Sequence, residues 1–196
     1  MKTSRTEKRL LKIKKVLSTR QDSLTIVLEN VHDPHNVSAI FRTCDATGIP
    51  EVFLIYSIEK FPRINRKSSA SAFKWVDKKK YKSVEECYSE LHSRGFMIYA
   101  SALNENSRNL FELDLTKKAA IVLGNEHRGA SEEAAALADE TFMIPMFGMV
   151  QSLNVSVAAA VILYEALRQR LGKGMYNEPH SIVAELEAKM EVWLKK

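Results

Sequence analysis

The chain has 196 residues and a formal net charge of +5, and 45 % of its residues are hydrophobic while 27 % are charged. This length and composition predict one folded domain with a sizeable apolar core and exclude a disordered chain. Two cysteines exclude a disulfide-rich scaffold, and no apolar stretch of the sequence reaches the length of a membrane span. The N-terminal segment lacks the apolar core of a signal peptide, so we expect a cytoplasmic protein.

Basic residues are concentrated in two segments. Residues 1–21 contain eight basic residues and one acidic residue, and residues 60–82 contain nine basic residues and one acidic residue. The rest of the chain is therefore acidic overall. Such clustering is the electrostatic footprint of a polyanionic partner, and it favours nucleic acid over two merely solvated faces.

The N-terminal half alternates predicted helices and strands. Apolar residues at helical spacing predict a basic amphipathic helix over 5–19. The elements predicted after it are a strand, a helix, a strand, a helix and a strand, over 23–29, 37–47, 51–56, 84–94 and 96–100. Residues 57–82 have no apolar period, and we interpret them as a loop with a short helix near 68–72.

The C-terminal half continues the alternation. Apolar runs predict strands over 119–123 and 141–144, and Ser131 is a suitable N-cap for a helix between them. Two further helices are predicted over 154–170 and 179–194. Strands that are apolar throughout and alternate with helices predict an α/β fold with a mostly parallel sheet and helices on both faces.

Ligands of such folds bind at the carboxyl ends of the strands, where this chain has polar segments. Four segments qualify, namely HDPHN, SALNENS, GNEHRG and PMFGMVQSLN. None contains the glycine fingerprint of dinucleotide-binding folds, a phosphate-binding P-loop or a hydrolase nucleophile elbow. We interpret His32, Asp33 and His35 as turn chemistry and expect no metal site. Cys44 and Cys87 lie in apolar helices and are expected to be core residues.

Two of these segments contain residues that a turn alone does not require and that could bind a ligand. In GNEHRG, glycines around Glu126 would allow a ligand to approach the backbone closely, although a solvated carboxylate in a turn is the alternative. In PMFGMVQSLN, backbone groups beside the methionines could bind an adenine-like ring. Ser152 and Asn154 are either part of that site or only helix caps.

Three motifs in this order resemble the SpoU branch of the SPOUT methyltransferases. They are NVSAIFRTCDATG, IVLGNEHRGAS and IPMFGMVQSLNVSVAAAVILYEALRQR, within a region of similarity over roughly 20–175. The sequence differs from many members in having Ser38 where glycine is common.

The resemblance implies a C-terminal deep trefoil knot and S-adenosylmethionine bound in it by backbone groups. It also implies a homodimer whose active site lies near the subunit interface. Carried over by position, the cofactor contacts are Ser101, Leu123, Gly124, Ile144, Met146, Ser152 and Leu153. The expected organisation is a basic N-terminal helix over 1–20, the methyltransferase domain over 21–175 and a C-terminal helix over 176–196.

The activity implied by the resemblance is methylation of the ribose 2′-hydroxyl of guanosine 18 in the D-loop of tRNA. The implied catalytic residues are Asn36, Arg42, Glu126, Ser152 and Asn154. Because a guanidinium rarely gives up its proton, stabilising the developing alkoxide is an easier role for Arg42 than acting as base. The basic residues expected to bind tRNA are Lys8, Arg9, Lys12, Lys15, Arg63, Arg66 and Lys67. The alternatives are the same chemistry on ribosomal RNA and a catalytically silent RNA-binding protein.

Overall fold

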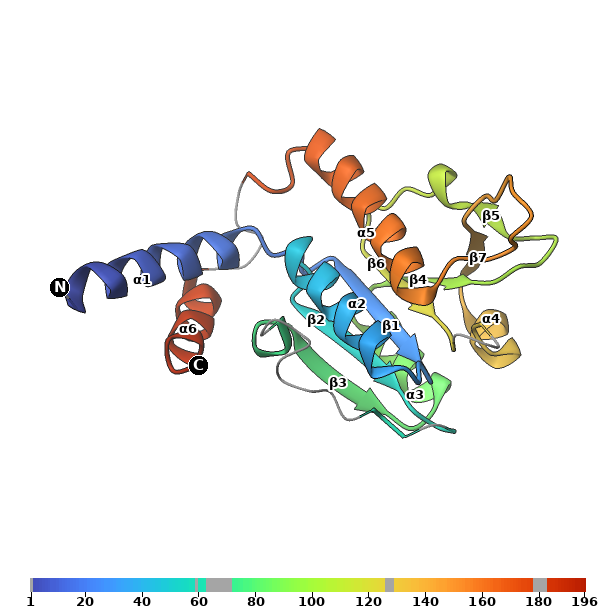
Figure 1. Ribbon diagram of the computed structural model, residues 1–196, viewed down its shortest axis with the longest axis horizontal. Helices are drawn as coiled ribbons and strands as arrows, with labels where there is room; N and C mark the ends of the chain where they lie inside the picture. The colour runs from blue at the N-terminus through green and yellow to red at the C-terminus, as the bar shows by residue number, and fades with distance from the viewer. Residues whose placement is uncertain (1, 59, 63–71, 126–128, 178–182) are drawn as a thin grey trace.

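A computed structural model describes residues 2–58, 60–62, 72–125, 129–177 and 183–196 of the chain. Its centre is a seven-stranded sheet of order β3-β2-β1-β6-β4-β7-β5, in which every neighbouring pair is parallel (Figure 1). The strands are β1 (Leu24–Glu29), β2 (Glu51–Ile55), β3 (Asp77–Tyr81), β4 (Met97–Ser101), β5 (Arg108–Asn109), β6 (Ala119–Leu123) and β7 (Glu140–Met143). The prediction of a parallel sheet is confirmed.

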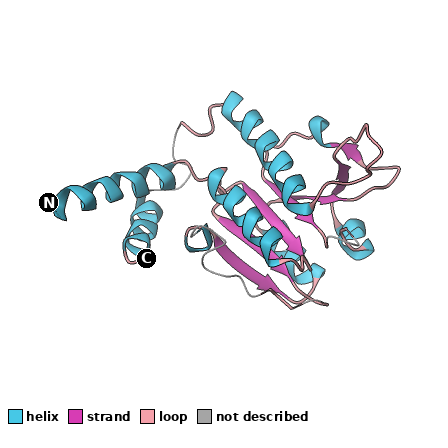
Figure 2. Ribbon diagram, in the orientation of Figure 1, coloured by secondary structure: helices cyan, strands magenta, loops and turns pink. Residues whose placement is uncertain are grey.

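Helices cover both faces of this sheet, as predicted (Figure 2). The α-helices are α1 (Lys2–Ser18), α2 (Pro34–Ala46), α3 (Val84–Ser93), α4 (Glu132–Leu137), α5 (Val155–Gly172) and α6 (Val183–Leu194), and the 3₁₀ helices are η1 (Ala72–Lys74) and η2 (Leu110–Glu112). The larger apolar cluster joins α2 and α5 to one face, and the smaller joins α3 and α4 to the other. Both faces of β1 and β6 are buried, which explains their continuous apolar sequences.

The interpretation of residues 57–82 as a loop is wrong over Asp77–Tyr81, which form the edge strand β3. All five of its residues pair in register with β2, from Glu51↔Asp77 to Ile55↔Tyr81. Its sequence is charged because an edge strand is exposed to solvent. Of the short helix expected near 68–72, residues 68–71 lie outside the described part, and η1 begins at Ala72.

The two terminal helices pack against each other at one end of the molecule (Figure 1). Ile13 and Leu17 of α1 are buried with Trp193 of α6. The ring of Trp193 lies 4.9 Å from that of Trp75, which follows η1, and the guanidinium of Arg20 lies over it at 5.3 Å. Aromatic and cation–π contacts therefore attach this helix pair to the sheet domain.

One arginine joins the end of α5 to the start of the sheet. Arg170 is fully buried, and its guanidinium donates to the backbone oxygens of Ser23, Leu115 and Lys117. It also donates to the side chains of Gln21 and Ser23. Burial lowers the pKa of Arg170 to about 10, while these acceptors satisfy its donors.

No helix in the described residues is long and apolar enough to cross a membrane.

Candidate functional site

The carboxyl ends of β1, β6, β4 and β7 are neighbours along one edge of the sheet. Leu28 pairs with Leu123, and Ser101 pairs with Phe142, two residues before Ile144. The register of β4 with β6 brings Ser101 beside Leu123. The structure therefore brings together the ends of the three strands from which cofactor contacts were expected.

The segment after β6 turns back sharply at Gly124. A Cβ atom on this residue would lie 2.0 Å from the backbone nitrogen of Ala130 and from the carbonyl carbon of Gly129. Only glycine fits so close an approach of two backbone segments. Gly129 has a φ of +70° and forms an antiparallel bridge with Asn125, which closes the loop. Glu126, within this loop, lies outside the described residues.

Two hydrogen bonds hold this loop against the end of β1. The Nδ2 of Asn125 donates to the backbone oxygen of Asn30 at 2.8 Å. The backbone nitrogen of Ser131 donates to Oε2 of the buried Glu29 at 2.9 Å. Ser131 also caps α4, as predicted, by accepting from the backbone nitrogen of Ala134. The sequence analysis did not predict that Glu29, Asn30 and Asn125 anchor this loop. The feature of the sequence that could have indicated this role is the position of Asn125 next to Gly124.

Helix α2 starts at this same edge and carries two of the expected catalytic residues. Asp33 is its N-cap and accepts from the backbone nitrogen of His35 at 2.8 Å, which is the turn chemistry expected there. Asn36 is 7 % exposed, near the helix start, whereas Arg42 is exposed and forms no hydrogen bond or ion pair with the described residues. Ser38 is buried, and its Oγ has no hydrogen-bond partner in the described part of the chain.

The segment from Ile144 to Leu153 connects β7 to α5. Within the described chain, its backbone forms no hydrogen bond with other backbone groups. Ile144, Met146 and Leu153 are half-buried, and Ser152 is exposed. The segment begins at the edge of the sheet that carries Ser101 and Leu123. Its backbone N–H and C=O groups have no backbone partner among the described residues and are therefore available to bind a nucleoside. The donor set and the close approach at Gly124 therefore fit the expected cofactor.

Asn154 is the N-cap of α5, which is one of the two roles considered for it. Its Oδ1 accepts from the backbone nitrogen of Ser156 at 2.9 Å and from the Oγ of Ser156 at 2.6 Å. Asn154 thereby fixes the point at which the loop ends and the helix begins.

The segment after β4 is held by a small polar cluster. The Oγ of Ser107 donates to the backbone oxygen of Ala102 at 2.7 Å and lies 3.2 Å from the Oγ1 of Thr141 in β7. Asn104 accepts from Ser107 and from the backbone nitrogen of Asn106. The segment beside Ser101 is thus tied to the neighbouring strand.

The described RNA-binding candidates are on the N-terminal helix. Lys8, Arg9, Lys12 and Lys15 are all exposed on α1, whereas Arg63, Arg66 and Lys67 lie outside the described residues. No group of three or more potential metal ligands occurs in the described part of the chain. Both cysteines are buried, as predicted, and burial raises the pKa of each thiol, that of Cys87 to about 12.

Comparison with known proteins gives consistent matches. The SpoU rRNA Methylase family matches residues 23–164. The chain is 49 % identical over 192 residues to a tRNA (guanosine(18)-2′-O)-methyltransferase of Thermus thermophilus, covering 98 % of each chain. It is 43 % identical over 179 residues to the enzyme of that name from Escherichia coli K12, covering 91 % of this chain and 78 % of the other.

Solved structures agree with these matches. A TrmH/SpoU tRNA modifying enzyme of Aquifex aeolicus is 42 % identical, with a TM-score of 0.91 over 97 % of this chain and 96 % of the other. The SpoU methyltransferase AviRb of Streptomyces viridochromogenes, solved in complex with AdoMet, is 26 % identical. Its TM-score is 0.71 over 80 % of this chain and 64 % of the other.

Proposed function

The chain belongs to the SpoU rRNA Methylase family, and on that premise we propose that it is a tRNA (guanosine(18)-2′-O)-methyltransferase. It is an S-adenosylmethionine-dependent RNA 2′-O-methyltransferase. The observation that carries the proposal is the identity of 49 % over 98 % of both chains with an enzyme of that name. A relative named as a 23S rRNA methyltransferase is 35 % identical, and only 60 % of it is covered, so tRNA is favoured over ribosomal RNA.

The cofactor is held by three segments at the carboxyl edge of the sheet. They contribute Ser101 from β4, Leu123 at the end of β6 with Gly124 directly after it, and Ile144, Met146, Ser152 and Leu153 from the segment before α5. Bound S-adenosylmethionine supplies an electrophilic methyl group on a sulfonium centre. The residues of this chain bind its nucleoside through backbone groups and exclude water with apolar side chains.

A trefoil knot formed by the C-terminal part belongs to the same proposal. Its support is the contact between the end of α5 and the segment that precedes β6. Gln169 accepts from the backbone nitrogen of Leu115 and donates to the backbone oxygen of Leu113. The chain thus leaves β6, forms β7 beyond β4, and returns to the segment that joins β4 to β6.

Catalysis requires a weakly acidic hydroxyl to be aligned with the methyl group and stabilised as its proton leaves. Arg42 supplies a positive charge to the 2′-oxygen. Asn36 and Glu126 orient Arg42 and the nucleotide. Ser152 and Asn154 hold the cofactor segment, a role that the capping of α5 by Asn154 supports.

We assign a homodimer on the basis of an exposed apolar surface. Phe147 and Met149 are 97 % and 100 % exposed. Val150 is exposed in the same segment, as are Val157 and Tyr164 on α5. A second copy of the chain covering this surface would bury apolar area beside the cofactor segment.

We place the enzyme in the cytoplasm, where it would meet tRNA. The terminal helices α1 and α6 act as an RNA-binding appendage of the methyltransferase domain.

The test is incubation of the protein with methyl-labelled S-adenosylmethionine and an unmodified tRNA transcript, followed by digestion to nucleosides. The expected product is labelled 2′-O-methylguanosine, and it disappears when position 18 of the transcript is changed to adenosine. Methylated bases alone, or an unlabelled tRNA beside a labelled ribosomal RNA, would overturn the proposal. The absence of label on any RNA would favour the alternative of a catalytically silent RNA-binding protein.

A further inference from the structure

The edge strand β3 carries three consecutive lysines whose side chains alternate between the two faces of the sheet. Lys78 and Lys80 pair with Val52 and Leu54, which belong to the apolar cluster under α2 and α5. Lys79 pairs with Phe53, which belongs to the cluster on the opposite face. Lys78 and Lys80 therefore share the face of the catalytic helix α2.

Of the three lysines, Lys79 forms ion pairs with described residues, whereas Lys78 and Lys80 do not. The Nζ of Lys79 lies 2.5 Å from Oε1 of Glu90 and 3.9 Å from Oε1 of Glu51. Neither Lys78 nor Lys80 forms an ion pair within the described residues, and both are exposed. An aromatic ring lies under each ammonium, that of Phe73 at 5.2 Å from Lys78 and that of Phe61 at 4.7 Å from Lys80.

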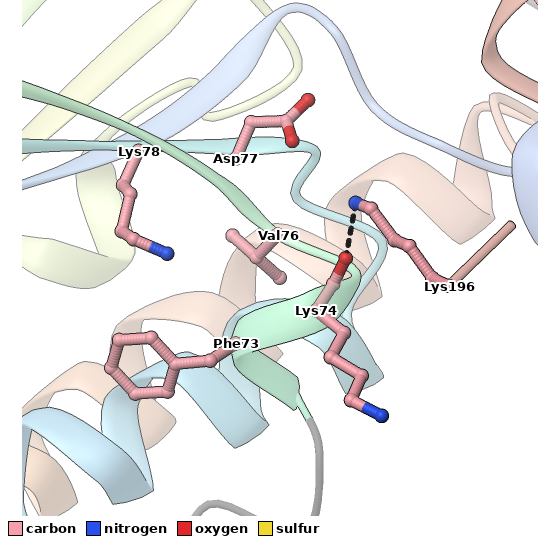
Figure 3. Close-up of a pocket in the computed structure, with 6 residues that line it drawn as sticks. All are labelled: Phe73, Lys74, Val76, Asp77, Lys78 and Lys196. Carbon is pink, nitrogen blue, oxygen red and sulfur yellow. Dashed lines mark hydrogen bonds between the residues drawn. The ribbon is translucent and has the colours of Figure 1, made fainter. Parts of the chain in front are cut away.

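Lys78 faces a surface hollow that lies beside η1 (Figure 3). Phe73 forms one side of it and Asp77 another, and the Lys78 ammonium lies between them (Figure 3). Lys196 also lines the hollow and donates to the backbone oxygen of Lys74. Burial lowers the pKa of the Lys78 ammonium, and the positive charges of Lys196 and Lys80 add to this effect against the opposing Asp77. Three lysines (Lys74, Lys78 and Lys196) and one carboxylate (Asp77) line the hollow, so its lining carries a net positive charge.

Direct contacts connect the two aromatic rings to the catalytic elements. The ring of Phe73 stacks at 4.0 Å on that of Phe41, the neighbour of Arg42 in α2. The ring of Phe61 meets that of Tyr56 edge-on at 5.2 Å. The hydroxyl of Tyr56 donates to the backbone oxygen of Val31, in the loop that leads to α2, at 2.8 Å.

We propose that Lys78 and Lys80, supported by Phe73 and Phe61, bind backbone phosphates of the RNA substrate that flank the methylated nucleotide. Residues two apart in a strand are about 6.6 Å apart, so two flexible lysines can contact neighbouring phosphates. Phosphate contacts position a nucleic acid without reading its sequence. This inference rests on the proposed function for the identity of the RNA. The competing role is that charged side chains on an edge strand prevent its pairing with other chains.

The test compares the double variant Lys78→Gln/Lys80→Gln with Lys79→Gln, a control on the same strand but on the opposite face. Binding of an unmodified tRNA transcript is measured by filter retention at several salt concentrations. We expect the double variant to bind about 10-fold more weakly at low salt. The slope of log K against log salt should fall in magnitude by about 1.4 to 1.8, because each phosphate contact contributes about 0.7 to 0.9.

Lys79→Gln and the double arginine variant Lys78→Arg/Lys80→Arg are expected to bind RNA as the wild type does. All variants should bind S-adenosylmethionine with unchanged affinity in calorimetry, which shows that they are folded. Unchanged RNA affinity and salt slope in the double glutamine variant would overturn the inference, and so would an equal loss in Lys79→Gln. Aggregation of the double variant without loss of RNA affinity would assign the lysines to edge protection instead.

The same experiment separates this inference from the proposed function. If the wild type methylates guanosine 18 and the double variant binds tRNA normally, the phosphate contacts are wrong and the function stands. If the wild type does not methylate guanosine 18 but the double variant loses RNA affinity, the function is wrong and the phosphate contacts stand.

Discussion

The side-chain amide of Asn125 donates a hydrogen bond of 2.8 Å to the backbone oxygen of Asn30, a residue 95 positions earlier in the chain. The bond joins the loop after β6 to the loop after β1. Asn30 has a φ of +51°, a conformation that asparagine tolerates better than most residues. Together with the hydrogen bond from the backbone nitrogen of Ser131 to Glu29, this contact holds the expected cofactor loop against the segment that leads into α2.

Replacing Asn125 with alanine should loosen that connection. The buried carbonyl of Asn30 would lose the donor, which costs about 1–3 kcal/mol of unfolding free energy. We expect weaker binding of S-adenosylmethionine in calorimetry and a lower midpoint of thermal unfolding. Asn106→Ala is the control, because Asn106 is exposed and its side chain forms no hydrogen bond with the described residues. Wild-type cofactor affinity in Asn125→Ala would show that this contact does not position the loop.

The substitution Gly124→Ala tests the close backbone approach directly. A Cβ at 2.0 Å from the backbone of Gly129 and Ala130 cannot be accommodated without moving one of the segments. We expect a loss of about 3 kcal/mol of stability, measured by urea unfolding, and loss of cofactor binding. Gly172→Ala, where a Cβ meets no atom within 4 Å, should change stability by less than about 1 kcal/mol. A stable Gly124→Ala protein that binds the cofactor would contradict the fold of this loop.

The central sheet was predictable because its strands are buried on both faces and therefore apolar throughout. The strand β3 was not, because its residues Asp77–Tyr81 are charged and become a strand only by pairing with β2. The two-residue strand β5 is too short to have a pattern. The position of β6 between β1 and β4 depends on contacts between distant segments, which hydrophobic periodicity does not report.

The candidate site was predictable to a similar extent. Strand ends followed by polar segments predicted a site at the edge of the sheet where β4, β6 and β7 end, and capping chemistry predicted the role of Ser131 at α4, whereas Asn154 was left open between a cap and a site residue. The assignment of individual cofactor contacts came from family resemblance rather than from the residue pattern. The anchoring role of Glu29 could not be predicted, because its partner, the backbone nitrogen of Ser131, is 102 residues away.

We predict that Arg42→Ala abolishes methyl transfer while leaving the affinity for S-adenosylmethionine nearly intact. The reason is that Arg42 is exposed on α2 and has no hydrogen-bond or ion-pair role within the described structure, so its removal should not disturb the fold. Single-turnover methylation of the tRNA transcript and calorimetry with the cofactor measure the two effects. Arg42→Lys keeps the charge but not the planar donor geometry, and we expect only partial activity. Loss of cofactor binding in Arg42→Ala would show that Arg42 supports the cofactor site, and it would contradict the assignment of Arg42 to the substrate.

Charge reversal of Lys12, Lys14 and Lys15 to glutamate should weaken RNA binding without unfolding the protein. These side chains are exposed, whereas Ile13 and Leu17 of the same helix form the contact with α6. We expect an affinity loss of about 10-fold or more for the tRNA transcript, with a strong dependence on salt. Lys117→Glu/Lys118→Glu, before β6, is a charge-reversal control on another surface, with two reversed charges instead of three. Unchanged affinity of the α1 variant at low salt would remove this helix from the binding surface.

The exposed apolar segment before α5 gives a prediction about assembly. If a second copy covers Phe147 and Met149, the variant Phe147→Asp/Met149→Asp should sediment as a monomer of 22.2 kDa where the wild type sediments as a dimer. Burying two carboxylates in an apolar interface is costly, so the equilibrium should move strongly towards monomer. Leu11→Asp is the control, because Leu11 is 66 % exposed on α1 and lies in a different element. A wild-type protein that remains monomeric at micromolar concentration would contradict the homodimer. A monomeric variant with full activity would show instead that the catalytic site is complete within one chain.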